Sequence, residues 1–546
     1  MNLDLPATGT AQPPLFVDAE QCGEWCAALQ LTNPIQTQAQ LLRQLHLLNC
    51  YTLAAAPRLA ILELLRAPIH FVQEESAKKF TGKPLPLAAP EQAAFDTAHG
   101  LWQALALGYL RCLDACLNGD VALLPQAALV CQRALAALVG DQADLTRAGR
   151  QPDDEHWGRV HAVLAAADRL DATTTAVTDP LRGGAAPTVT DAYVESMLLA
   201  AANLHELTPR QQGWAMRWAR RWAGKVVIHP APPPESPALP LCVDLASAEP
   251  ARFKPYTGSG ARWLDTAELR KSLKKRLKLL AEGGEANTPE QLGLGRDCQQ
   301  PACGDALRRV YPRWVKGGVL RRHERHPMHG ACRFVVGVDA IHYYLSGSQP
   351  FKPPGSASVD VLRRQREELA TFGRFATRFE EEYSRDHGYQ LENWEIVEDW
   401  GMLDQSNGGL RLERPLKQAG GRLGIGQLVA VQPANANGLL LGAVRWAQTT
   451  GASLVTGIQM FPGRPVPVAV RGTGVMAERE AYRPGFLLPP VEALELPACV
   501  VLPPGSHKPG RIMEAWTPAA SQRLRLKEVI DRGADFERVA CETMPD

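Results

Sequence analysis

The stretch LDQSNGGLRL, residues 403–412, decides how the C-terminal half of the chain folds. It contains Asp404 and Ser406, whose side chains favour turns because they bond to nearby backbone groups. Gly408 and Gly409 follow, and glycine permits the positive φ angles and the close backbone approach that a hairpin turn needs. Strand-like sequence lies on both sides. We therefore expect a β-turn here that joins two antiparallel strands.

Short β-like runs separated by Gly, Pro and Asn surround this turn from about residue 320 onward. They lie at 333–345, 394–400, 409–412, 428–431, 439–446 and 454–460. Many short strands with turn signals between them indicate a barrel or a sandwich. Residues 347–392 interrupt the series with a segment rich in Gly, Pro and Ser and then a strongly charged helical pattern. We interpret them as a helical insertion in a β domain that spans 319–475, and we expect a β-rich extension at 476–546.

A second motif, LRRHERHP, stands just before the first expected strand and contains Arg321, Arg322 and Arg325. Arg321 and Arg325 form the pattern RxxxR. A planar guanidinium group can pair with N7 and O6 of guanine through two parallel hydrogen bonds, and it can also stack on a purine or bind a phosphate. Alone, RxxxR arises often by chance in an arginine-rich chain. The DxSxxG pattern of the turn could, alone, be no more than a hairpin turn.

Together, in this order and on these elements, the two patterns resemble the signature motifs of the PilZ domain, a family of bacterial regulators that bind cyclic di-GMP. The resemblance covers about residues 320–467, where GAVRW at 442–446 and GIQMF at 457–461 look like later strands of that family. It implies an antiparallel six-stranded β-barrel. It also implies a cyclic di-GMP site, which we expect to contain Arg321, Arg322, Arg325, Asp404, Ser406 and Gly409.

The resemblance assigns a role to each motif. In the PilZ family the arginine segment closes over the ligand, which implies this role for Arg321 and Arg325, with Arg322 as an adjacent candidate. Asp404 can accept hydrogen bonds from guanine N1 and N2, and the Ser406 hydroxyl can donate to a phosphate. The chain departs from the family pattern in the long insertion between the motifs. This insertion must loop out of the barrel, or else it covers the site and gates the ligand.

Residues 1–224 have a helical period and lead us to expect an all-helical N-terminal domain. Near its end Trp214, Trp218 and Trp222 fall four residues apart, with arginines between them. Such a pattern could stack nucleic-acid bases. A tryptophan stripe buried in the core, with arginines on the solvated side, is the interpretation that we favour.

Residues 225–318 look like a linker region with short strands and helices around a proline-rich stretch. A basic amphipathic helix at 270–280 within it could contact nucleic acid or an anionic partner. A solvated face over a leucine seam is the interpretation of that helix that we favour. The net charge of +1 gives no support to a nucleic-acid-coating protein. We therefore do not expect a nucleic-acid partner.

The N-terminus has no basic segment followed by an apolar one, and the most apolar stretch is interrupted by polar residues. We therefore expect a cytoplasmic protein without a membrane partner. The twelve cysteines include no CxxC pair. We expect reduced thiols that pack as small hydrophobic side chains.

No enzymatic motif stands out. The sequence contains no phosphate-binding GxxxxGK[ST] loop, HExxH or GxSxG pattern. His323, His326 and His329 recur every three residues, but they lie in a loop-like segment where this spacing fixes no geometry, so we expect no metal site. We expect neither an enzyme nor a cofactor.

The sequence thus predicts a multidomain α+β protein, with an all-helical N-terminal domain followed by a PilZ-like antiparallel six-stranded β-barrel with a helical insertion. The function that we expect is a cyclic di-GMP-binding effector that acts on a bacterial surface behaviour such as motility, pili or biofilm. A protein partner would bind through the helical domain. The alternatives are a PilZ-like interaction adaptor that has lost its ligand and a nucleic-acid-binding regulator.

Overall fold

The chain forms two compact units. The computed structural model describes residues 3, 5–9, 12–233, 240–256, 258–284, 287–317, 324–354, 397–434, 436–473 and 480–544. Unit 1 comprises Met1–Lys83 and Leu87–Arg321, and unit 2 comprises Pro84–Pro86 and Arg322–Asp546. The residues that the sequence indicated as a helical insertion lie mostly outside the described residues.

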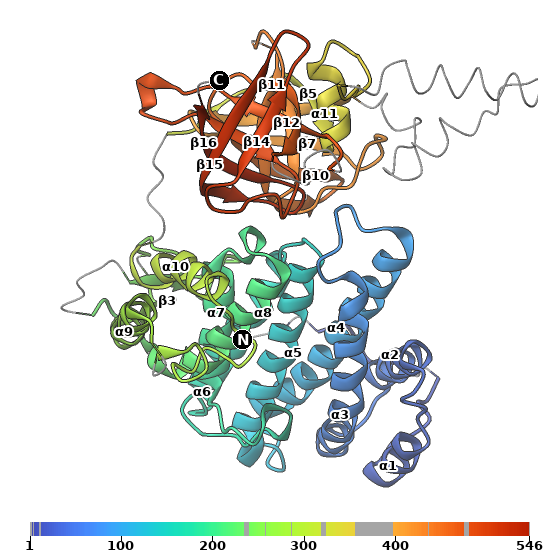
Figure 1. The fold of residues 1–546 in the computed structure, drawn as a ribbon. Coiled ribbons are helices and arrows are strands. Elements are labelled where there is room, and N and C mark those ends of the chain that lie inside the picture. Colours follow the sequence, from blue (N-terminus) through green and yellow to red (C-terminus); the bar gives the residue numbers. More distant parts are fainter. Residues whose placement is uncertain are drawn as a thin grey trace, which may run out of the picture. The chain divides into compact units, whose positions relative to one another are not determined.

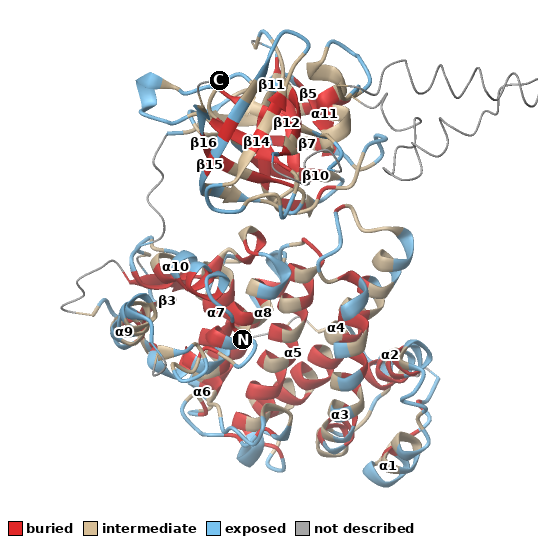
Figure 2. Cartoon of the chain, viewed as in Figure 1, coloured by how far each residue is buried: buried red, intermediate tan, exposed pale blue. Residues whose placement is uncertain are grey.

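Unit 1 begins with a series of helices, and from α2 onward each helix packs on the next along the chain. They are α1 (Ala19–Ala27), α2 (Pro34–Cys50), α3 (Ala55–Phe80), α4 (Ala89–Leu117), α5 (Ala127–Arg147), α6 (Asp154–Arg169), α7 (Val189–Ala202) and α8 (Pro209–Trp222). Helix α3 packs on α4, and α4 packs on α5 (Figure 1). Buried residues concentrate in α5 and α7, whereas α1 is largely exposed (Figure 2).

Helix α8 shows how local signals start these helices. Thr208 is its N-cap and Pro209 occupies the first turn, where proline costs no hydrogen bond. The Thr208 backbone N–H donates to the Gln211 side chain, and the Gln211 N–H donates to the Thr208 hydroxyl. This reciprocal capping box satisfies backbone donors that a helix start otherwise leaves open.

The tryptophans of α8 lie in the core, which confirms the interpretation favoured from the sequence. Trp214, Trp218 and Trp222 are each about 1% exposed. Their spacing of four places them on one helix face, where the rings of Trp218 and Trp222 stack with centroids 6.0 Å apart. The Trp218 indole N–H donates to the Leu294 carbonyl at 2.8 Å, so its polar atom is satisfied inside the core.

The residues that the sequence indicated as a linker region belong to unit 1. They form a three-stranded sheet in the order β1-β3-β2, from β1 (Val227–His229), β2 (Leu241–Asp244) and β3 (Ala261–Asp265), and the helices α9 (Ala267–Glu282) and α10 (Ala302–Val315). Their buried side chains, among them Leu264 and Trp314, belong to the same hydrophobic cluster as those of the preceding helices.

One expectation about the cysteines is wrong. Cys298 and Cys303 form a disulfide, with Cα atoms 5.4 Å apart. The other ten cysteines are free, and most of them are buried, as expected for small hydrophobic side chains. Among the described residues, no helix combines the length and the apolar character that crossing a bilayer requires.

The first half of unit 2 is an antiparallel barrel. Its strands are β4 (His326–Pro327), β5 (Ala331–Val336), β6 (Glu398–Ser406), β7 (Gly409–Pro415), β8 (Leu428–Pro433), β9 (Leu440–Thr450) and β10 (Ser453–Met460). The sheet order is β4-β6-β5-β8-β9-β10-β7, and β6 also pairs with β7. This last pairing closes a ring of six strands, to which the short β4 is added along the same edge of β6 as β5.

The strand expected at 333–345 is shorter than the sequence indicated. Strand β5 ends at Val336, and Gly337 follows with a φ of 91°. Helix α11 (Val338–Leu345) then begins, and it buries Ile341 and His342. A left-handed glycine breaks the strand, and the apolar residues beyond it have helical spacing.

The second half of unit 2 is a closed barrel, where the sequence indicated a β-rich extension. Its strands run β11 (Val466–Gly472), β12 (Arg483–Leu488), β13 (Cys499–Leu502), β14 (Ile512–Trp516), β15 (Ser521–Arg532) and β16 (Glu537–Met544). They close in the order β11-β12-β13-β16-β15-β14. Strand β11 pairs with β12 and β14, so residues 466–472 are part of this second barrel.

The two barrels share a hydrophobic core at their junction, and the second barrel has a further core of its own. A single cluster contains Leu428 and Leu441 from the first barrel and Phe486 and Val501 from the second. The backbone N–H of Leu428 donates to the carboxylate of Asp535 at 2.8 Å. Because core and backbone contacts continue across the junction, the two barrels form one packed body.

Candidate ligand site on the first barrel

The two sequence motifs meet in space. Arg325 Nη1 lies 2.8 Å from Asp404 Oδ1, although the two residues are 79 positions apart. Strand β4 causes this meeting, because His326 pairs with Gln405 and Pro327 with Asp404. Arg321 and Arg322 lie outside the described residues, so their expected part in the site stays a prediction.

The hairpin turn carries the remaining motif residues. Ser406 pairs with Gly409 across the turn between β6 and β7. The Ser406 hydroxyl donates to the Gly409 carbonyl at 3.4 Å, which is long for an O–H···O bond. Because this bond is weak, the hydroxyl can exchange it for a better acceptor such as a phosphate oxygen.

Gly409 is required for a reason other than a positive φ. A Cβ atom at this position would stand 2.6 Å from the carbonyl oxygen of Ile458 on the neighbouring strand β10. Such a contact is far inside the ordinary van der Waals separation. The glycine therefore allows β7 to approach β10 closely at the point where the turn enters the barrel.

Two further residues extend the site across the outer surface of the barrel. Asp404 on β6 pairs with Arg411 on β7, Arg411 pairs with Gly457 on β10, and Gly457 pairs with Trp446 on β9. These residues thus form one row across four adjacent strands. A Cβ atom on Gly457 would stand 2.1 Å from the Trp446 Nε1, so the indole occupies the space that glycine leaves.

Sequence reasoning missed Arg411 as a site residue and used Trp446 only as a mark of the fold. Arg411 lies two residues after Gly409, and side chains two apart on a strand share a face. That alternation was the available signal for Arg411. The signal for Trp446 was weaker, because its neighbours depend on the register of β9 against β10 and on the irregularity between Gly457 and Ile458.

The row and the adjacent Arg325 together carry a net positive charge. Arg325 and Arg411 both face the single carboxylate of Asp404, at 2.8 Å and 3.8 Å. The side chains of Arg325, Arg411 and Asp404 are 32%, 45% and 16% exposed. An exposed ion pair is worth about 0–1 kcal/mol. The pair therefore positions Arg325 beside the turn, but a ligand can displace it at small cost.

A buried ion pair supports the row from inside the barrel. Arg414 points inward from β7, is 1% exposed, and forms an ion pair with Glu398 on β6. Glu398 also accepts from the Trp400 indole N–H at 2.8 Å, and the Arg414 guanidinium lies 5.1 Å from the Trp400 ring centroid. These contacts join β6 and β7 beneath the surface residues, so the strands that carry the site are held together.

The histidines near the arginine motif do not form a shared site. His326 and His329 are exposed, and His323 lies outside the described residues. His342 is buried on α11, and burial lowers its pKa to about 4. Within the ranges that the structure describes, no three His, Cys, Asp or Glu side chains gather as metal ligands do.

Arg445 connects the site to the second barrel. Its Nε donates to the Gln459 side chain at 2.6 Å, and its guanidinium forms an ion pair with Asp531 on β15. Gln459 pairs directly with Gly409. The turn that carries the DxSxxG motif is therefore two side-chain contacts away from the second barrel.

Two family models match the chain. Residues 20–234 match the N-terminal domain of the family described as cyclic-di-GMP receptor FimW, and residues 468–544 match the FimW C-terminal beta-barrel domain. The second match coincides with strands β11–β16. The chain is also similar to the cyclic-di-GMP receptor FimW of Pseudomonas aeruginosa, with 25% identity over 554 residues that cover 92% of this chain and 87% of that protein.

These matches confirm two expectations from the sequence. The chain resembles a family of cyclic di-GMP receptors, as its two motifs indicated. The expected fold class is also confirmed, since a helical N-terminal domain precedes antiparallel barrels of six strands. The matched domains flank the first barrel, which lies within the longer alignment to FimW.

Proposed function

We propose that this chain is a cyclic di-GMP-binding effector, and the similarity to the cyclic-di-GMP receptor FimW is the premise from which the proposal starts. The observation that carries it is the meeting of Arg325 with Asp404 beside the Ser406 hydroxyl. An arginine, a carboxylate and a hydroxyl on one exposed edge provide the groups that recognise a guanine and a phosphate. The chain acts by binding, without chemistry.

Arg325 and the side chains of the row each have a part in this binding. Arg325 and Arg411 provide two positive charges for the two phosphodiester groups of the ligand, and a free guanidinium can pair with guanine N7 and O6. Asp404 accepts hydrogen bonds from guanine N1 and N2 once Arg325 turns toward the ligand. The partly exposed Trp446 indole offers a flat surface on which a base can stack.

Ligand binding exchanges contacts rather than adding them. Arg325 leaves Asp404, which costs about 0–1 kcal/mol, and gains charge-assisted hydrogen bonds worth about 1.5–3 kcal/mol each. The exchange therefore favours the bound state even though the free site is closed by its own ion pair. Arg321 and Arg322 add further cations from the same motif.

We propose that ligand binding changes the conformation of unit 2 and, with it, the protein surfaces that unit 2 binds. A ligand shifts a conformational equilibrium only by its different affinity for the two arrangements. Here the difference arises at the arginine motif and passes through Arg445 to the second barrel, which shares a core with the first. A protein partner of the helical unit then reads the change and acts on motility, pili or biofilm formation.

Calorimetric titration of the full chain with cyclic di-GMP and with cyclic di-AMP tests the proposal. Guanine presents two acceptors, N7 and O6, whereas adenine presents N7 and an amino donor that repels a guanidinium. We expect heat from cyclic di-GMP and binding weaker by about tenfold or more from cyclic di-AMP. Absence of heat from cyclic di-GMP would contradict the proposal and would favour an adaptor that binds only proteins.

A further inference from the structure

A cavity of about 360 Å³ opens within the helical unit, far in the sequence from the barrel motifs. Residues of α3, α4, α5, α7 and α8 line it, together with the short 3₁₀ segment η2 (Pro180–Arg182). Pockets for small ligands commonly measure about 300–1,000 Å³. The cavity is therefore large enough to hold a small molecule.

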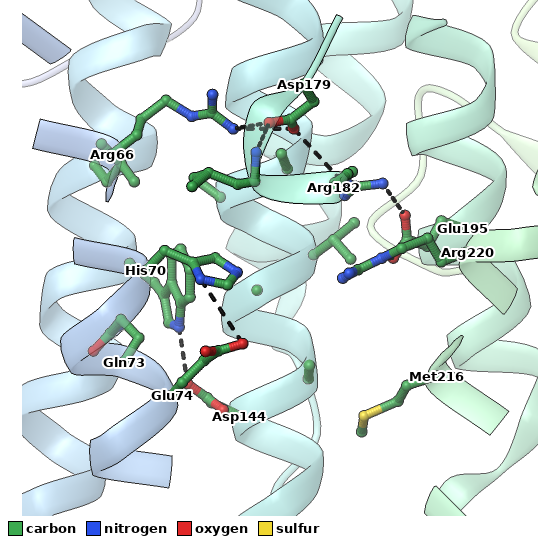
Figure 3. Close-up of a pocket in the computed structure, with 18 of the residues that line it drawn as sticks. Arg66, His70, Gln73, Glu74, Asp144, Asp179, Arg182, Glu195, Met216 and Arg220 are labelled. Carbon is green, nitrogen blue, oxygen red and sulfur yellow. Dashed lines mark hydrogen bonds and ion pairs between the residues drawn. The ribbon is translucent and has the colours of Figure 1, made fainter. Parts of the chain in front are cut away.

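Arginines gather at one end of this cavity (Figure 3). Asp179 is 1% exposed and accepts from Arg66 Nη2 at 2.9 Å. Arg133 Nη1 lies 3.4 Å and Arg182 Nε lies 3.6 Å from the same carboxylate. Burial alone would raise the pKa of Asp179, but the hydrogen bond from Arg66 and the charges of Arg66, Arg133 and Arg182 outweigh it and lower the pKa.

The cluster continues along the wall of the cavity. Arg182 Nη1 lies 2.7 Å from Glu195 Oε2, and Arg220 Nε lies 3.0 Å from Glu195 Oε1. Glu195 is 2% exposed, whereas half of the Arg220 side chain is exposed to solvent. Figure 3 shows Arg182, Glu195 and Arg220 in a continuous chain of contacts. We call Arg66, Arg133, Arg182 and Arg220 the arginine cluster.

The arginine cluster has more positive charges than the carboxylates around it can neutralise, and more N–H donors than those carboxylates can accept. The carboxylates that contact it are Asp179, Glu195 and Glu63, of which Glu63 pairs with Arg133 at 3.1 Å. Four guanidinium groups carry about twenty N–H donors, and three carboxylates accept about twelve hydrogen bonds. Tyr109 and the Leu181 backbone take two of these acceptor sites, while the Gln132 side chain and the Thr178 carbonyl accept two of the Arg133 donors. Donors therefore remain for water or for an anion in the cavity.

Stability gives little reason for this arrangement. Buried ion pairs lose about as much free energy through desolvation as they gain through attraction, and well-packed apolar residues often stabilise a core equally well. Arg133, Asp179 and Glu195 are each at most 3% exposed, and all three line the cavity. Such a wall is suited to recognition of a charged molecule.

The rest of the cavity carries both polar and apolar side chains, and Gln73, Glu74 and Asp144 are among the polar ones. Met216 on α8 and Leu199 on α7 line it, and so does the indole of Trp102. The Trp102 ring packs against Gly140, where a Cβ atom would stand 2.8 Å from the ring. The cavity thus combines a cationic end with a few apolar side chains, and this combination can orient a ligand that has a charged head and an apolar part.

We propose that this cavity binds a small organic anion, whose phosphate or carboxylate head contacts the arginine cluster and whose body lies against Met216 and Trp102. This site is independent of the barrel site and of the cyclic di-GMP function. A guanidinium group can form two parallel hydrogen bonds with a phosphate or with a carboxylate, so the experiment below distinguishes the two head groups.

The test uses the full chain, with GMP as the phosphate probe and succinate as the carboxylate probe. Each is titrated by calorimetry into the parent, Arg220→Gln and Met216→Trp. Arg220 is half exposed and Glu195 keeps Arg182 as a partner, so Arg220→Gln should leave the fold intact. The larger side chain at Met216 should fill the cavity without removing a charge. We expect at least one probe to bind and each variant to weaken it by about tenfold or more.

Arg221→Gln is the matched control, because Arg221 neighbours Arg220 on α8 but contacts Gly293, outside the cavity. Its affinity for the probe should stay within about twofold of the parent, since no contact to the anion is lost. The preferred probe then identifies the head group. Binding of neither probe overturns the proposal, and so does binding that Arg220→Gln and Met216→Trp leave unchanged.

Discussion

The indole of Trp446 lies over Gly457 on the outer surface of the first barrel, where a Cβ atom would stand 2.1 Å from the indole Nε1. Gly457 also pairs with Arg411, which faces Asp404. The glycine therefore places an aromatic ring beside the charged residues of the site. A change at Gly457 should therefore affect both the packing of the first barrel and the surface that we propose binds the ligand.

Gly457→Ala is expected to displace this indole. The added methyl group overpacks the surface, so unit 2 should lose about 1–3 kcal/mol of stability. Affinity for cyclic di-GMP should fall as well, because the ring leaves its place beside Arg411. Thermal denaturation and calorimetric titration measure the two effects. Gly438→Ala is the control, since no atom lies within 4 Å of a Cβ there, and equal behaviour of both variants would contradict the account.

Phe536→Ala is expected to destabilise both barrels together. Phe536 is 1% exposed, and its ring centroid lies 5.4 Å from that of Phe461 in the first barrel. Removal of a buried phenylalanine costs about 3–5 kcal/mol. Because the barrels share a core, denaturant unfolding followed by hydrogen exchange should show faster exchange in both. Ile530→Ala at an exposed position is the control. Faster exchange in the second barrel alone would refute the shared core.

The stability of the helical unit should fall as the pH rises above neutrality. His99 Nδ1 lies 2.7 Å from the buried carboxylate of Asp141, and this hydrogen bond raises the pKa of His99. The charge of Asp153 adds to the increase, while burial and Arg150 oppose it. Because the pKa of His99 is higher in the folded state than in the unfolded state, protonation of His99 stabilises the fold. This stabilisation is complete below pH about 6.5, the pKa of an unperturbed histidine, and it is lost as the pH rises through the pKa of His99 in the folded protein.

The size of this pH effect is limited, because 40% of the His99 side chain is exposed. A partly exposed pair contributes about 1 kcal/mol or less. Denaturation midpoints between pH 6 and pH 9 measure it, and His99→Gln should flatten the profile. His46→Gln, at an exposed position on α2, should leave the slope unchanged. An unchanged slope in His99→Gln would show that this histidine is not the cause.

Local signals allowed the sequence to predict the elements of the fold better than their assembly. The turn at Asp404–Gly409 and the tryptophan stripe of α8 depend on residues close in the chain, and both are found in the structure. Closure of the second barrel depends on the pairing of β11 with β14, which no short pattern encodes. The disulfide of Cys298 with Cys303 was missed because that spacing fits no familiar motif.

For the candidate site too, short motifs identified individual residues, whereas contacts between distant parts of the chain were missed. The motifs identified Arg325, Asp404 and Ser406, but the direct contact of Arg325 with Asp404 depends on the register of β4 against β6. Arg411 could have been found from strand alternation. The arginine cluster of the helical unit could not, because Arg66 and Asp179 are 113 positions apart and meet only through helix packing.

The most direct test of the central claim is calorimetric titration of cyclic di-GMP into the parent, Arg325→Ala and Ser406→Ala, with Arg333→Ala as the matched control. Arg333 is an exposed arginine on the neighbouring strand β5, outside the row that contains Asp404. Loss of a charge-assisted hydrogen bond weakens binding by about tenfold or more, so Arg325→Ala and Ser406→Ala should each show this loss. Arg333→Ala should bind as the parent does. Parental affinity in Arg325→Ala would contradict the account.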